Sequence, residues 1–154
     1  MKEKFLVAYM DMAKRFAELS TARRLKVGAI IVKEDRVISI GYNGMPSGWD
    51  NNCELEDWPD WMKDRDQLDP AYLRLRSKPE VLHAEANAIT KVARSSESCE
   101  NAAIFCTHTP CIECAKLIYQ SGITEVYIGE DYVARKGCGE DFLMKTGIKI
   151  EKIA

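Results

Sequence analysis

The chain has 154 residues, enough for one domain with its own hydrophobic core, and we expect residues 1–154 to form a single domain. Its net charge of -2 and pI of about 5.8 argue against electrostatic binding of a long nucleic acid. No apolar run approaches the roughly 20 residues of a membrane-spanning helix. Because residues 1–4 also lack the apolar core of a signal peptide, we expect a cytoplasmic protein without membrane partners.

The first quarter of the chain predicts a helix followed by a hairpin. Apolar residues recur at helical spacing over residues 3–19. Residues 26–32 form an almost continuous apolar run, which is typical of a buried strand. After a polar turn, residues 37–40 predict a second strand that pairs with the first in an antiparallel hairpin. Three glycines and a proline in residues 41–48 then predict a loop.

A polar stretch over residues 50–78 is too long for a plain connection, so we expect a lid or insert with some helix of its own. Residues 70–76 could form one short helical piece of it.

The second half of the chain alternates between helical and strand patterns, which indicates a mixed sheet covered by helices. The expected elements are a helix over 81–93, a strand over 102–107, a helix over 111–120, a strand over 124–128, a helix over 140–146 and a strand over 148–153.

Two short stretches carry the residue types of a metal site. Cys111 and Cys114 are three residues apart, so on a helix they share a face. A helix N-terminus also favours the thiolate form that zinc needs. His83 lies near the start of another predicted helix, and helices that follow parallel strands begin at the same edge of a sheet. A histidine and two thiolates would leave one zinc position open, as catalytic zinc sites do.

Glu85 follows His83 by two residues and could act as an acid/base beside the metal. The pattern H-x-E…P-C-x-x-C is typical of zinc-dependent deaminases that act on nucleobases.

Less specific interpretations of the same residues exist. A Cys-x-x-Cys pair can be a redox pair or half of a structural zinc ribbon. The Ile-Glu spacer between the cysteines argues against a redox pair, and the lack of a second Cys-x-x-Cys pair argues against a zinc ribbon. Because the chain has no export signal, its six cysteines indicate free thiols and a metal site rather than disulfides. His108 could line the site or be an ordinary loop histidine.

Several segments together resemble the deoxycytidylate (dCMP) deaminase branch of the cytidine deaminase superfamily. The Gly-Tyr-Asn-Gly stretch at 41–44 points to this branch in particular. The segments are 27–32 (VGAIIV), 41–46 (GYNGMP), 83–89 (HAEANAI), 110–118 (PCIECAKLI) and 120–123 (QSGI).

The resemblance implies a three-layer α/β/α sandwich with a central five-stranded mixed sheet. It implies zinc-dependent hydrolysis of dCMP to dUMP and ammonia, which feeds thymidylate synthesis. One catalytic Zn²⁺ per subunit is expected, and a second zinc is not. The implied roles are zinc ligands for His83, Cys111 and Cys114, proton shuttle for Glu85, sugar contact for Asn43, base contact for the Ala84 backbone, and phosphate contacts for Arg24, Lys26 and Tyr132.

The resemblance also implies regulation. The expected effectors are dCTP as activator and dTTP as inhibitor, with Mg²⁺ on the triphosphate. The assembly would be a homo-oligomer, with a hexamer favoured over a dimer. The implied effector segment consists of Gly41, Tyr42, Asn43 and Gly44.

Two alternatives to this function stay open. A zinc deaminase could act on another cytosine or purine nucleoside or nucleotide, or on a base in tRNA. The chain could also be a non-catalytic nucleotide-binding regulator, although Glu85 would then have no purpose.

Overall fold

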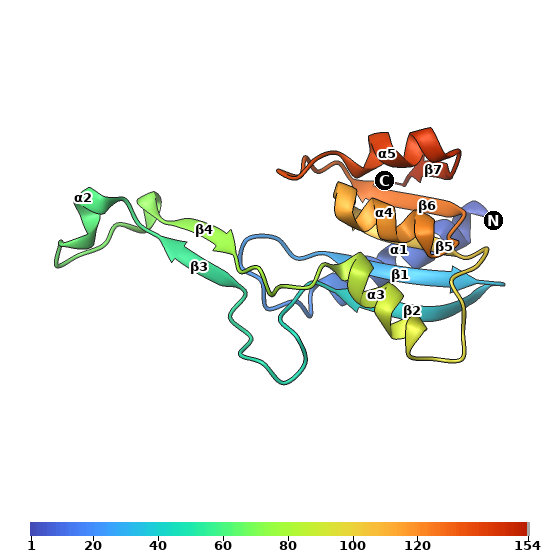
Figure 1. The fold of residues 1–154 in the computed structure, drawn as a ribbon, viewed down its shortest axis with the longest axis horizontal. Coiled ribbons are helices and arrows are strands. Elements are labelled where there is room, and N and C mark those ends of the chain that lie inside the picture. The colour runs from blue at the N-terminus through green and yellow to red at the C-terminus, as the bar shows by residue number, and fades with distance from the viewer. Residues whose placement is uncertain (154) are drawn as a thin grey trace.

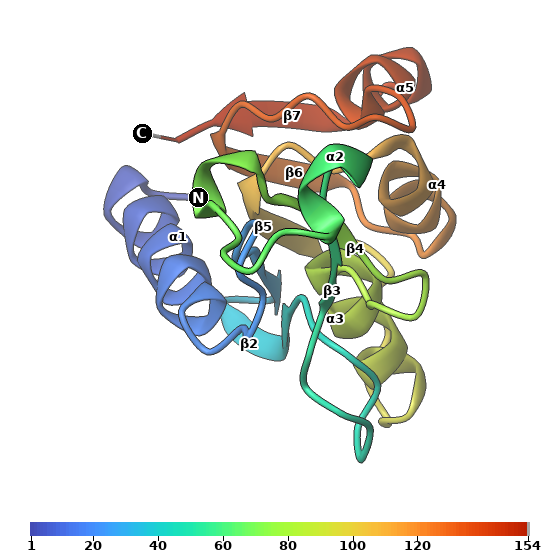
Figure 2. The same ribbon diagram turned by 90° about the vertical axis from the view of Figure 1, so that its left-hand side faces the viewer.

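The computed structural model describes residues 1–153. Its centre is a five-stranded sheet with the strand order β2-β1-β5-β6-β7, and helices cover both faces (Figures 1 and 2). The expected three-layer α/β/α sandwich is therefore confirmed. The bounds are α1 Glu3–Ala17, β1 Gly28–Lys33, β2 Arg36–Tyr42, β3 Glu54–Asp57, α2 Asp60–Lys63, η1 Pro70–Tyr72, β4 Arg74–Ser77, α3 Ala84–Ala93, β5 Ala103–His108, α4 Ile112–Gln120, β6 Glu125–Glu130, α5 Gly139–Thr146 and β7 Lys149–Lys152.

The two faces of the sheet carry two separate hydrophobic clusters. Successive side chains of a strand point to opposite faces, so Ile30 and Ile31 in β1 belong to different clusters. Ile30 packs on the side of α1, where Met10 and Phe105 are fully buried. Ile31 packs on the side that α3 and α4 cover (Figure 2). Burial on both faces explains the continuous apolar run in β1.

Strand direction determines where the helices start. β1 pairs antiparallel with both β2 and β5, so β2 and β5 run in the same direction. The chain enters α3 after β2 and the insert that follows it, and enters α4 directly after β5. Both helices therefore begin at the same edge of the sheet, as the sequence predicted.

The polar insert forms an arm that projects from the sheet (Figure 1). Its strands β3 and β4 pair antiparallel as a separate two-stranded sheet, and the short helices α2 and η1 lie beyond them. The prediction of a helical piece over residues 70–76 was wrong after Tyr72. Residues 74–77 form β4 and pair with an acidic strand, where Arg76 Nε contacts Asp57 Oδ2 at 3.1 Å.

Polar contacts fix the root of the arm to the body. Glu54 is buried, and one of its carboxylate oxygens accepts the backbone N–H groups of Arg23 and Arg24 at 2.8 and 3.2 Å. No helix among residues 1–153 is long and apolar enough to span a membrane.

Candidate active site

Each half of the zinc motif occupies the start of a helix. His83 is the residue immediately before α3, and its carbonyl accepts the N–H of Asn87 at 2.9 Å. Paired hydrogen bonds between Gly44 and Leu82 fix the chain just before it. Cys111 is the residue immediately before α4, and Cys114 lies in its first turn. The neighbouring helix starts thus bring together three side chains that are 28 and 31 residues apart in sequence.

The spacing of the three ligand atoms fits one zinc ion. His83 Nδ1 lies 3.5 Å from Cys111 Sγ and 3.4 Å from Cys114 Sγ, and all three atoms lie within 4.8 Å of one another. A tetrahedral zinc, with Zn–S of about 2.3 Å and Zn–N of about 2.0 Å, separates sulfur and nitrogen by about 3.5 Å. Three protein ligands leave the fourth position for a reactant, which is the arrangement of a catalytic zinc site.

The pKa values of the two cysteine thiols are shifted by their contacts with each other and with His83. A hydrogen bond from Cys114, together with one from His83, lowers the pKa of Cys111 to about 3. The same pairing with Cys111, reinforced by burial, raises the pKa of Cys114. These opposite shifts favour the thiolate form at Cys111 and the thiol form at Cys114. A divalent cation would favour loss of the second proton.

Glu85 belongs to the same site and lies in the first turn of α3. It is only 3% exposed, and this burial raises the pKa of its carboxyl group. A raised pKa makes the carboxyl group a better proton acceptor than an exposed glutamate, which suits a proton shuttle. Its position in the first turn of α3 fixes it beside His83 on the wall of the cavity described next.

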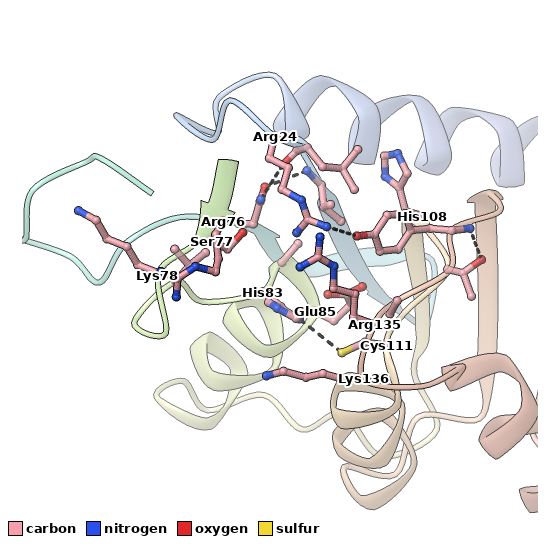
Figure 3. Close-up of a pocket in the computed structure, with 18 of the residues that line it drawn as sticks. Arg24, Arg76, Ser77, Lys78, His83, Glu85, His108, Cys111, Arg135 and Lys136 are labelled. Carbon is pink, nitrogen blue, oxygen red and sulfur yellow. Dashed lines mark hydrogen bonds between the residues drawn. The ribbon is translucent and has the colours of Figure 1, made fainter. Parts of the chain in front are cut away.

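The metal-ligand group opens into a cavity of about 350 Å³ (Figure 3). Glu85 is the one carboxylate among its described lining residues. Five cationic side chains also line it, and Arg24 and Arg135 both reach toward its middle in Figure 3. Within residues 1–153, Arg76 is the one of these five that pairs with a carboxylate. The five are Arg24, Arg76, Lys78, Arg135 and Lys136.

Two of the three predicted phosphate contacts lie in this cavity. Arg24 donates from a guanidinium nitrogen to the Tyr132 hydroxyl at 3.4 Å, across 108 residues of sequence. Lys26 does not line it, and instead borders a second hollow of about 210 Å³ beside α1. The His108 ring, which the sequence left unassigned, borders both spaces, and its Nδ1 lies 2.9 Å from Thr107 Oγ1.

Asn43 lines the cavity, but much of its amide is already engaged. Its Oδ1 accepts the N–H of Val27 at 2.8 Å, and its Nδ2 donates to the carbonyl of Leu25 at 2.8 Å. These bonds hold the cavity wall at residues 25–27 against the end of β2. One N–H and one lone pair of the amide are left over, so a contact with the sugar stays a prediction.

The rest of the predicted effector segment has visible packing roles. Gly41 lets α3 approach β2 closely, because an ideal Cβ there would lie 2.2 Å from the carbonyl oxygen of Ala84. The carbonyl of Tyr42 accepts the side-chain N–H of Asn87 at 3.2 Å. Ala84 itself lines the cavity, which suits the predicted backbone contact with a base. An effector role for this segment stays a prediction.

Sequence reasoning missed four of the cavity's cationic residues. Arg76 and Lys78 come from the root of the arm, and Arg135 and Lys136 from the loop before α5. No local pattern links these segments. The one available signal was their basic character in a chain that is acidic overall.

The chain is similar to proteins of known family. A family model described as the cytidine and deoxycytidylate deaminase zinc-binding region matches residues 3–130. The deoxycytidylate deaminase of Enterobacteria phage T4 is 34% identical over 150 residues, covering 81% of this chain and 77% of the phage protein. The human deoxycytidylate deaminase is 37% identical over 124 residues, covering 80% of this chain and 63% of the human protein.

Solved structures agree with these matches. The crystal structure of a dCMP deaminase from the cyanophage S-TIM5, in complex with dCMP and dUMP, is 40% identical and superimposes with a TM-score of 0.83 over 99% of both chains. The matches confirm the resemblance noted in the sequence and the expectation of a hydrolytic deaminase. The chain belongs to the cytidine and deoxycytidylate deaminase family.

Proposed function

We propose that residues 1–154 form one deaminase domain that converts dCMP to dUMP and ammonia. One observation carries the proposal: a His-Cys-Cys metal-ligand group and a buried glutamate share a cavity with five cationic side chains. The metal-ligand group and the glutamate suit hydrolysis of the cytosine amine, and the cationic side chains suit binding of a phosphate. The deoxycytidylate deaminases among the relatives support the same substrate.

His83, Cys111 and Cys114 would hold the zinc. Zinc bound there would supply an activated water for attack on the cytosine ring. Glu85 takes a proton from the attacking water and delivers it to the ring nitrogen next to the reacting carbon. It then takes the second proton of that water from the hydroxyl group now on the ring carbon and passes it to the leaving amine, so the carbonyl forms, the C–N bond breaks and ammonia departs. Burial raises the pKa of the carboxyl group, which favours its return of each proton after it has acted as a base.

The cationic side chains support a nucleotide, rather than a nucleoside, as the substrate. Guanidinium and ammonium groups bind phosphate through charge-assisted hydrogen bonds, and such bonds are stronger than neutral ones. Arg24, Lys78, Arg135 and Lys136 have no carboxylate partner within residues 1–153 that would compete with a phosphate. Arg24 and Tyr132, already hydrogen bonded to each other, would contact the phosphate together.

Regulation and assembly are part of the same proposal. We infer activation by dCTP with Mg²⁺, inhibition by dTTP, effector contacts at residues 41–44, and a homo-oligomer that is a hexamer rather than a dimer. The resemblance to the dCMP deaminase branch is the support for these points. A cytoplasmic location and the absence of a nucleic-acid partner are predictions from the sequence.

A substrate panel tests this function. Zinc-loaded protein is incubated with dCMP, CMP and deoxycytidine, with and without dCTP and Mg²⁺, and the loss of cytosine absorbance is followed. The proposal predicts turnover of dCMP well above that of deoxycytidine. Equal turnover of the nucleoside would remove the phosphate role of the cations, and turnover insensitive to dCTP would remove the regulation.

A further inference from the structure

Cys138 lies directly opposite Cys111, one of the proposed zinc ligands, in an isolated antiparallel bridge. The N–H of Ile112 donates to the carbonyl of Gly137 at 3.3 Å, and this hydrogen bond lies beside the cysteine pair. They are therefore a non-hydrogen-bonded pair, whose Cα atoms are about 4.5 Å apart with side chains on the same side. A disulfide spans Cα separations of about 4.4–6.8 Å, so the backbone already suits one.

Two glycines hold Cys138 in this place. An ideal Cβ at Gly139 would lie 2.2 Å from the carbonyl oxygen of Pro110 and 2.7 Å from that of Cys111. The backbone at the start of α5 thus lies directly against the segment that carries the metal ligand. Gly137, on the other side, has a φ of +123°, which other residues rarely adopt. Cys138 therefore cannot move far from Cys111 without a change in this packing.

Exposure separates Cys138 from the other thiols. Cys138 is exposed, whereas Cys111 is 7% and Cys114 is 2% exposed. The thiols outside the metal site are also buried, namely those of Cys53, Cys99 and Cys106. A small oxidant that approaches the folded protein would meet the Cys138 thiol first, and with zinc bound this is also a sulfur not engaged by the metal.

We propose that Cys138 and Cys111 form a reversible disulfide in the presence of a peroxide, and that this bond dismantles the metal site. The inference rests on the proposed function only in taking Cys111 as a zinc ligand. It assigns to Cys138 a redox role that the deamination reaction does not need.

The chemistry balances with hydrogen peroxide as the oxidant. The Cys138 sulfur attacks one peroxide oxygen, an S–O bond forms, the O–O bond breaks, and one water leaves. The Cys111 sulfur then attacks the Cys138 sulfur, an S–S bond forms, the S–O bond breaks, and a second water leaves. Two thiols have been oxidised and one peroxide reduced. Cys111 has lost the thiolate that held the metal, so zinc is released.

The disulfide would be short-lived in a reducing compartment. Disulfides in such compartments are transient and usually catalytic or redox-sensing. A dithiol reductant would restore both thiols, and added zinc would then rebuild the site. The predicted behaviour is a deaminase that loses its metal under oxidation and recovers it afterwards.

The test follows zinc and covalent structure without measuring turnover. Zinc-loaded protein in reductant-free buffer is titrated with hydrogen peroxide while a chromophoric chelator reports released zinc. Intact mass and a non-reducing peptide map are then recorded. The inference predicts zinc release in step with a mass loss of about 2 Da, corresponding to two hydrogens, and a linked peptide pair that contains Cys111 and Cys138. Dithiothreitol and zinc should reverse both changes.

Two variants sharpen the result. Cys138→Ser should keep its zinc at peroxide doses that strip the unchanged protein. Cys99→Ser removes a buried thiol that is neither a proposed metal ligand nor the bridge partner of Cys111. This variant should lose zinc like the unchanged protein. The inference fails if Cys138→Ser loses zinc just as fast, or if the disulfide joins Cys111 to Cys114 instead. A metal-free sample treated in the same way must also show the Cys111–Cys138 link, so the result does not depend on the deaminase assignment.

Discussion

The carbonyl oxygen of Ala84 occupies the space that a side chain at Gly41 would need: an ideal Cβ at Gly41 would lie 2.2 Å from it and 2.7 Å from the Ala88 nitrogen. Gly41→Ala must therefore push α3 away from β2, and the start of α3 carries His83 and Glu85. We expect a loss of about 1–3 kcal/mol in the free energy of unfolding, as overpacking typically costs, and reduced turnover.

Gly44→Ala is the matched control for this change. Nothing lies within 4 Å of an ideal Cβ at Gly44, which is three residues farther along the same segment. Its free energy of unfolding should stay within about 0.5 kcal/mol of the unchanged protein, as for most surface substitutions. Equal denaturation midpoints for the two variants would show that the close approach at Gly41 has no energetic importance.

Metal removal should destabilise the fold. Zinc that binds only the folded chain stabilises it by about 2.7 kcal/mol at a concentration one hundred times its dissociation constant. A strong chelator should therefore lower Tm, and added zinc should restore it. Cys114→Ser should remove most of this zinc-dependent shift, because the second thiolate is lost. A Tm that does not respond to chelation would contradict a bound zinc in the protein as purified.

The buried carboxyl of Glu85 gives a pH-dependent prediction for the metal-free protein. Burial raises its folded-state pKa above the ordinary value of 4.5. As pH rises from 4.5 to that raised pKa, the unfolded chain loses the proton and the folded chain keeps it, so the free energy of unfolding falls. Glu85→Gln carries no such contribution. In metal-free samples its Tm advantage over the unchanged chain should grow with pH across this window and then level off.

The opposite trend, an advantage that shrinks with rising pH, would mean that the ionised carboxylate is stabilised in the folded state. The measured quantity is the difference in Tm between the two proteins at each pH. Groups whose titration the substitution leaves unchanged contribute equally to both Tm values and cancel in this difference.

The cationic wall of the cavity should set the preference for a nucleotide. A hydrogen bond to a charged group contributes about 1.5–3 kcal/mol, so losing one from Arg135 should lower kcat/KM for dCMP by roughly ten- to more than a hundredfold. Deoxycytidine has no phosphate, and its kcat/KM should change little. Arg36→Ala removes an arginine on β2 that pairs with Glu97 outside the cavity, and it should leave both values unchanged. Equal losses for both substrates in Arg135→Ala would assign Arg135 a structural role.

The helices and strands that could be predicted from the sequence are those whose buried apolar residues follow a regular spacing or a continuous run. The helix expected over 81–93 is α3, because its buried residues recur on one side. The hairpin of β1 and β2 followed from an apolar run next to a polar turn. The arm could not be predicted in this way. Its strand β3 is a mostly acidic segment that pairs with β4, where Arg74 lies opposite Asp57 and Arg76 contacts the same carboxylate.

The same distinction applies to the site. His83, Glu85, Cys111 and Cys114 were predictable, because each half of the motif is local and the strand order brings the halves together. The cations that face them come from the loop after α1, the root of the arm and the loop before α5. Their convergence depends on tertiary packing, which no spacing in the sequence encodes. Closeness in sequence does not guarantee a shared cavity either: Lys26 is two residues from Arg24, yet it borders a different hollow.

The central claim is that Glu85 moves protons in the hydrolysis of dCMP, beside a metal that His83, Cys111 and Cys114 hold without it. The most direct test measures zinc content and dCMP turnover together in the unchanged chain and in Glu85→Gln. We predict one zinc per chain in both proteins and a loss of about a hundred- to ten-thousandfold in turnover for the variant. A variant that keeps its zinc and still converts dCMP at the original rate would contradict the account.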